Sequence, residues 1–154
     1  MIRRLGRLSA PVALLAACTG AASTPETLSL AGGFVYAPAA GTEAAGYVTI
    51  ENSSPGEDTL LLVRSPAAGM VHVHRQVPDG GMVRMEPVER LPIPSGATRL
   101  EPGGLHLMLT ALTGTLTPGD SVDLTFRFGH AGERTVRVPV IAYGDAPPVE
   151  ERTP

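Results

Sequence analysis

The chain has 154 residues, 43% of them hydrophobic, which favours one domain of ordinary size with an apolar core. All twelve basic residues are arginine, and they form no cluster interleaved with aromatic residues, which argues against nucleic-acid binding. The 18 glycines and 15 prolines are spread between apolar runs, so we expect many turns and no long low-complexity block.

Residues 1–17 have the layout of a bacterial export signal. Three arginines precede a short apolar run, which is too short to span a bilayer stably. The run closes with Leu15-Ala16-Ala17-Cys18, which resembles the signal at which a lipoprotein cysteine is acylated and becomes the first residue. We therefore predict a lipoprotein signal peptide over 1–17 and a lipid anchor at Cys18. The alternative is an ordinary signal that leaves Cys18 as a free thiol.

The single cysteine has no internal disulfide partner, so the cysteine count does not indicate the redox compartment. The export signal does, and it places the protein outside the cytoplasm. We expect the protein in the cell envelope, on the periplasmic side, lipid-anchored through Cys18. Residues 18–27 are small, polar and proline-containing, and we expect them to form a flexible tether. Removal of the signal leaves nine positive against fifteen negative charges, about −6, so membrane contact is expected through the lipid alone.

Short segments rich in Val, Leu, Thr, Ile, Tyr and Phe follow the tether, and turn residues separate them. No segment has the period of a helix, so the pattern predicts an all-β single domain over 28–142, a Greek-key barrel or sandwich, with a flexible tail over 143–154. Alternation in the last two segments favours antiparallel pairing. We expect strands at Leu28–Tyr36, Gly46–Asn52, Thr59–Arg64, Val71–Val77, Met82–Pro87, Thr98–Glu101, Leu105–Leu112, Ser121–Phe128 and Arg134–Ile141.

Histidine and methionine gather between residues 65 and 112, which hold three of the four histidines and four of the five methionines. Successive side chains of a strand point to opposite faces. Three leucines alternate with His106 and Met108, so the leucines can enter a core while the imidazole and thioether share the other face. The same alternation turns two valines inward and places His72 and His74 on the opposite face.

Imidazole and thioether donors, with neither thiolate nor carboxylate among them, prefer monovalent copper to zinc, calcium or magnesium. The alternative is that the methionines fill a core. The residues alone give as candidate ligands His74, His106 and Met108, with Met85 or Met82 as a further sulfur.

Three other donors are weaker candidates. His72 could join His74 at a divalent copper or zinc site, and is otherwise a polar surface histidine. His130 lies in a predicted turn, where we expect it to be solvated. Met70 lies next to Gly69, just before an expected strand, and could be a sulfur at the rim of the site, but we expect it to be packed.

The donor spacing resembles that of the PCuAC-type periplasmic copper chaperones. Ten residues separate His74 from Met85, and twenty separate Met85 from His106-Leu107-Met108. The segments Ala45–Asn52, Asp79–Val88 and Glu101–Leu109 also read like this family, and the resemblance covers residues 28–141. It implies a cupredoxin-like fold and places the copper ligands at His74, Met85, His106 and Met108. The gap after Met85 is slightly shorter than in the family, so Met82 remains its rival.

The resemblance implies an extracytoplasmic chaperone for Cu(I). Its client would be the binuclear copper centre of cytochrome c oxidase subunit II, with SCO-type assembly factors as further partners. Two alternatives remain: a metal-free β-sandwich envelope lipoprotein that acts as an interaction or structural module, and a copper-sequestering tolerance protein.

Other chemistry has less support in the sequence. No carboxylate pair or Ser–His–Asp arrangement suggests catalysis, so we do not expect an enzyme. A blue-copper carrier needs a cysteine thiolate within the domain, and this chain has no cysteine after Cys18.

Overall fold

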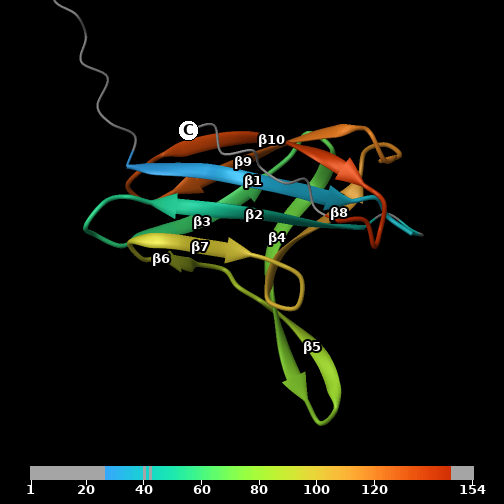
Figure 1. Ribbon diagram of the computed structural model, residues 1–154, viewed down its shortest axis with the longest axis horizontal. Helices are drawn as coiled ribbons and strands as arrows, with labels where there is room; N and C mark the ends of the chain where they lie inside the picture. Colours follow the sequence, from blue (N-terminus) through green and yellow to red (C-terminus); the bar gives the residue numbers. More distant parts are fainter. Residues whose placement is uncertain (1–26, 40, 42, 147–154) are drawn as a thin grey trace, which may run out of the picture.

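The computed structural model describes residues 27–39, 41 and 43–146. The predicted signal peptide, Cys18, most of the predicted tether and the last eight residues of the predicted tail lie outside this part of the chain. The described residues form strands and turns without a helix, so none of them forms a helix that could cross a membrane (Figure 1). The strands are β1 (Leu28–Tyr36), β2 (Ala44–Asn52), β3 (Asp58–Arg64), β4 (Ala68–Asp79), β5 (Met82–Pro87), β6 (Leu91–Ile93), β7 (Gly96–Leu100), β8 (Leu105–Leu112), β9 (Ser121–Phe128) and β10 (Glu133–Ile141).

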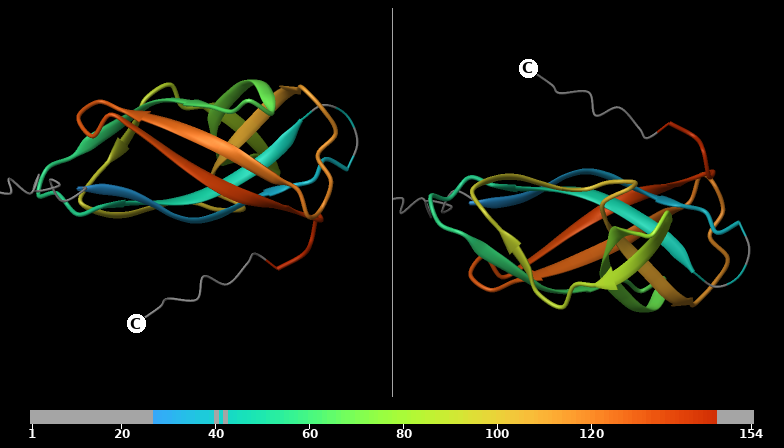
Figure 2. Two further views of the ribbon diagram at one scale, coloured as in Figure 1. Left: turned by 90° about the horizontal axis from the view of Figure 1, so that it is seen from above. Right: turned by 90° about the horizontal axis from the view of Figure 1, so that it is seen from below.

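Seven strands close into a barrel in the order β3, β4, β8, β2, β1, β10 and β9 (Figure 2). The circle closes because β3 pairs with β9 on one side and with β4 on the other. Each neighbouring pair is antiparallel except β1 and β10, which are parallel. Closure pairs the edges that an open sheet would expose, and the all-β class predicted from the sequence is confirmed.

Alternate residues of the barrel strands fill its interior. Val122, Leu124, Phe126 and Phe128 of β9 are all buried, as their spacing predicts. Complete burial of a side chain of this size contributes about 1.5–3 kcal/mol. The core therefore holds the barrel strands in a fixed register, and that register determines which side chains meet on the outer face.

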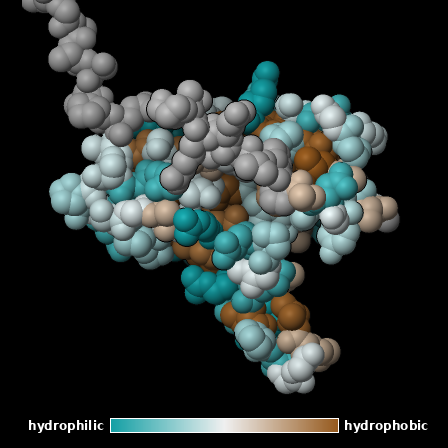
Figure 3. Space-filling model, viewed as in Figure 1, coloured by the Kyte–Doolittle hydropathy of each residue, from teal (hydrophilic) through white to brown (hydrophobic). Residues whose placement is uncertain are grey.

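The end of β4 leaves the barrel and pairs with β5 alone, so the two strands project as an arm (Figure 1). Gly80 and Gly81 connect them, with φ angles of 58° and 90°. A two-residue turn of this kind needs positive φ at both central positions, which glycine adopts without strain. Apolar side chains are exposed on the arm (Figure 3).

Four strands, β1, β5, β8 and β9, have the bounds that the sequence predicts, and five others differ at their ends. The largest difference is in β4, which begins three residues earlier and ends two residues later than predicted. The sequence analysis missed β6, where Leu91-Pro92-Ile93 pairs with β3. Proline donates no hydrogen bond to a ladder, so it fits a short strand at an edge.

Candidate metal centre

Two neighbouring barrel strands carry most of the candidate donors. In the antiparallel ladder between β4 and β8, His74 lies opposite His106, and His72 lies opposite Met108. Directly opposed residues of such a ladder point to the same side of the sheet. The four side chains therefore share one face, which we call the donor face, while the alternate valines and leucines of both strands are buried in the core.

The imidazoles of His74 and His106 are close enough to share an ion. Their ring centroids are 5.8 Å apart and their planes are at 88°. Two imidazoles that bind one ion through metal–nitrogen bonds of about 2.0–2.1 Å have centroids about 5–6 Å apart. The separation of the two rings is therefore suited to the binding of one metal ion by both imidazoles.

A backbone contact selects the tautomer of His106, which is only 3% exposed. Its Nδ1 lies 3.3 Å from the carbonyl oxygen of Gly104. Since a carbonyl can only accept, Nδ1 carries the proton and donates it, which leaves the lone pair on Nε2. Metal-binding histidines commonly have this arrangement, because the hydrogen bond orients the ring and fixes its tautomer.

His74 has no such partner on its inner nitrogen. Its Nδ1 is buried and makes no hydrogen bond. An unsatisfied buried polar atom costs roughly 1–3 kcal/mol, so its presence calls for an explanation. A bound ion would supply the missing partner.

The pKa of His74 is also lowered, which keeps the ring in the neutral form that binds metals. Burial is the main cause, and the nearby rings of His106 and His72 add to it, while the carboxylate of Glu43 acts in the opposite direction. A neutral imidazole offers a lone pair where an imidazolium does not.

The two candidate sulfur donors of β5 lie on opposite faces of the arm. Met85 pairs with Gln76, two residues from His74, so it lies on the donor face. Met82 pairs with Asp79, an odd-numbered position of β4, so it lies on the opposite face and is 75% exposed. The register brings Met85, and not Met82, to the side of the imidazoles.

The ring of His72 is close to that of His74 but is not oriented to bind the same ion. Its exposed ring stacks on that of His74 with centroids 6.1 Å apart and planes at 13°. Lone pairs lie in the ring plane, so two stacked rings do not aim them at a common point. The structure does not bring His72 and His74 together as a chelating pair.

Histidines and carboxylates alone do not make a metal cluster in this part of the molecule. Among the described residues, no three His, Cys, Asp or Glu side chains converge in an arrangement suited to a metal ion. The candidate donors that remain beside the two imidazoles are the thioethers of Met85 and Met108, which share the donor face.

One expectation for a single residue needs correction, and another is met. Met70 was expected to be packed, but it is 57% exposed, because the even-numbered positions of β4 face outward. The side chain of His130 is 85% exposed, as expected, yet its Nδ1 lies 3.3 Å from Oδ1 of Asp58. It is a solvated residue with a fixed partner.

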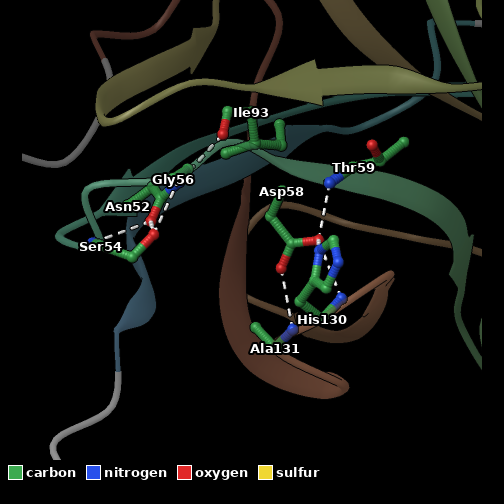
Figure 4. A network of polar contacts seen from close by, with 8 residues as sticks. All are labelled: Asn52, Ser54, Gly56, Asp58, Thr59, Ile93, His130 and Ala131. Carbon is green, nitrogen blue, oxygen red and sulfur yellow. Dashed lines mark hydrogen bonds and ion pairs between the residues drawn. The ribbon is translucent and has the colours of Figure 1, made fainter.

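Sequence reasoning missed the polar network around Asp58 and Asn52 (Figure 4). The buried carboxylate of Asp58 accepts hydrogen bonds from the backbone amides of Thr59, His130 and Ala131. No sequence signal identifies it, because two of these partners are more than seventy residues away. This network contains no orphaned atom and holds the 129–132 turn against β3.

The residues that form the barrel match a known protein family. Residues 28–140 match the family model LpqE-like, described as "Putative lipoprotein LpqE-like". A protein of Leifsonia xyli subsp. xyli (strain CTCB07), named "Putative lipoprotein Lxx21020", is 30% identical, and the match covers 93% of each chain.

Solved structures of PCuAC-type proteins share the cupredoxin-like fold. Copper(I)-bound DR1885 of Deinococcus radiodurans is 29% identical, with a TM-score of 0.63 over 82% of this chain and 85% of that one. Its apo form is 26% identical, with a TM-score of 0.58 over 92% and 97% of the two chains. The copper-bound PCuAC domain from PmoF2 is 24% identical, with a TM-score of 0.64 over 75% and 93%. The resemblance and the cupredoxin-like fold expected from the sequence are confirmed, and the chain belongs to the LpqE-like family.

Proposed function

We propose that this protein binds Cu(I) on its donor face and carries the ion as a chaperone outside the cytoplasmic membrane. The proposed ligands are His74, Met85, His106 and Met108. The observation that carries the proposal is the buried, unpartnered Nδ1 of His74 beside the oriented ring of His106.

The donor chemistry supports a cargo site for a monovalent ion. Thioethers and neutral imidazoles are soft or borderline ligands, and a site without a thiolate binds without deprotonating sulfur. Neutral ligands also leave the positive charge of the ion uncompensated, which favours release to a partner that offers thiolates. A chaperone needs both retention and release.

The relatives support copper as the cargo and the envelope as the location. Two of the similar solved structures contain copper, and one of these contains copper(I). The family and the Leifsonia relative are named as lipoproteins. We propose that residues 1–17 direct export and that Cys18 carries the lipid on the periplasmic side.

The proposed client is the binuclear copper centre of cytochrome c oxidase subunit II, with SCO-type assembly factors as further partners. This assignment rests on the resemblance to PCuAC-type chaperones. Mixing the copper-loaded protein with the apo oxidase domain tests it, since a chaperone transfers the ion and a sequestering tolerance protein keeps it.

A competition titration tests copper binding itself. The mature chain carrying Cys18→Ser is titrated with Cu(I) against a chelator, beside the variants His106→Ala and Met108→Leu and the matched control Met82→Leu. We expect the wild type and the control to bind the first equivalent with equal affinity and the other two variants to bind it more weakly. Equal, weak affinity in all four proteins would favour the metal-free module.

A further inference from the structure

The row of donors on β4 extends beyond the four proposed ligands. Met70, His72 and His74 occupy successive outward positions of the strand, and the first two are exposed. Across the ladder, His72 lies opposite Met108, and Met70 lies opposite the next outward residue after Met108. Met108 therefore has two imidazole neighbours on the donor face. His72 lies across the ladder on β4, and His106 lies two residues earlier on β8.

Met70 and His72 also line a common pocket between β3 and β4. The pocket has a volume of about 250 Å³. The one cationic side chain among its lining residues, Arg64, donates two hydrogen bonds to the carboxylate of Glu133, so its charge is paired. A cation can approach the thioether and imidazole of this pocket without facing an unpaired guanidinium.

His72 does not belong to the site of the other two histidines, because its ring is stacked on that of His74 and does not turn toward His106. Its nearest soft donors by register are Met70 and Met108. This set has the same chemistry as the proposed cargo site, namely imidazole and thioether, and therefore the same preference for Cu(I).

We propose that Met70, His72 and Met108 form an outer Cu(I) site through which the ion reaches and leaves the site of His74 and His106. The inference rests on the proposed function. It explains how a partner could reach a site whose His106 ring is almost fully buried, since Met70 and His72 are exposed.

The transfer is an exchange of neutral ligands. On loading, the ion keeps its bond to the sulfur of Met108. The imidazoles of His74 and His106 then replace the nitrogen of His72 and the sulfur of Met70. Copper stays monovalent throughout, and no electron is gained or lost.

Methyl NMR of methionine tests the outer site directly. The mature Cys18→Ser chain, labelled with ¹³C at the methionine methyl groups, is titrated anaerobically with Cu(I). We expect the first equivalent to shift Met85 and Met108. The second equivalent, bound by Met70 and His72 while Met108 stays with the first ion, should shift Met70, with Met82 unchanged. A Met70 signal that does not move through two equivalents would overturn the outer site.

The variant His106→Ala separates this inference from the proposed function. Without the inner imidazole, the first equivalent should go to the outer site and shift Met70 and Met108. If the wild type takes up copper normally but Met70 stays unshifted in this variant, the outer site is wrong and the cargo site stands. If the wild type takes up no copper, both proposals fail.

Transfer kinetics provide the second test. Met70→Leu and His72→Ala should each slow loading from a Cu(I)–chelator complex about tenfold, while the affinity for the first equivalent stays close to that of the wild type. Met82→Leu, an exposed methionine off the donor face, should load at the wild-type rate. Wild-type rates in both Met70→Leu and His72→Ala would contradict the proposed route.

Discussion

Two polar centres of this barrel are built in opposite ways. Around Asp58, every carboxylate oxygen accepts at least one hydrogen bond. Around His106, one imidazole is oriented by a carbonyl, but the neighbouring Nδ1 of His74 is buried without a partner. The first centre is complete as the chain folds, whereas the second leaves a place for a ligand.

The comparison shows how burial distinguishes a structural centre from a binding site. Asn52 donates to the carbonyls of Gly56 and Ile93 and accepts from Ser54, which joins the turn after β2 to β6 (Figure 4). Such a network stabilises the fold whether or not a ligand is present. The donor face retains an uncompensated cost, which binding removes.

The variant Asp58→Ala should have the largest effect on stability. Three partly buried amides would lose their charged acceptor, so we expect the free energy of unfolding to fall by about 3 kcal/mol. Urea unfolding measures the change. Asp123→Asn, at an exposed carboxylate that pairs with Arg137, is the control and should change stability little. Equal effects of the two variants would contradict the structural role of Asp58.

The variant His106→Ala should have the largest effect on copper. We expect the affinity for Cu(I) to fall about 100-fold, or about 2.7 kcal/mol, because an oriented nitrogen ligand is lost. A competition titration measures it, and circular dichroism checks that the variant folds. Asp58→Asn is the counterpart, and in its folded state it should bind copper as the wild type does.

The two sulfurs of β5 give a sharper and smaller contrast. Met85→Leu should weaken Cu(I) binding about tenfold, or about 1.4 kcal/mol, whereas Met82→Leu should leave it unchanged. The strand register is the reason, since only Met85 shares the face of His74. The reverse ranking would mean that the arm is registered differently when copper is bound.

The two centres should also respond to acid in different pH ranges. The pKa of His74 is lowered by burial, so apo stability should fall as the pH drops below the unfolded value of 6.5 and level off below the folded value. Burial acts to raise the pKa of Asp58, but its hydrogen bonds outweigh this and lower it from 3.8, so its contribution is lost only as the pH falls through the lower folded value.

Unfolding of apo wild type and His74→Gln at pH 7.5 and 5.5 measures the histidine effect. The wild type should lose more stability than the variant between these two values, by less than about 1.4 kcal/mol for each unit of pKa shift. An identical loss in both proteins would show that His74 does not account for the acid sensitivity.

Alternation along single strands was readable from the sequence, but pairing between strands was not. The period of two correctly places His106 and Met108 together, and His72 and His74 together, on faces opposite to the core. The meeting of His74 with His106 depends on two strands whose histidines are thirty-two residues apart. That register is set by the packed barrel. The residues alone offered His74 and His106 as candidate ligands, and the resemblance to a known family implied that they share one site.

The same limit explains the other differences. The hydrogen bonds of Asp58 to the 129–132 turn cross more than seventy residues, and nothing local marks this aspartate as buried. The strand β6 contains Pro92, and proline is found in strands mainly at the edge of a sheet. The sequence alone does not show that this segment pairs with β3 as an edge strand.

X-ray absorption spectroscopy of the Cu(I)-loaded mature chain tests the central claim most directly. We predict a first shell with nitrogen at about 2.0 Å and sulfur at about 2.3 Å, with the nitrogen contribution reduced in His106→Ala and the sulfur contribution reduced in Met108→Leu. A shell of light atoms alone, unchanged in both variants, would contradict a site built from these imidazoles and thioethers.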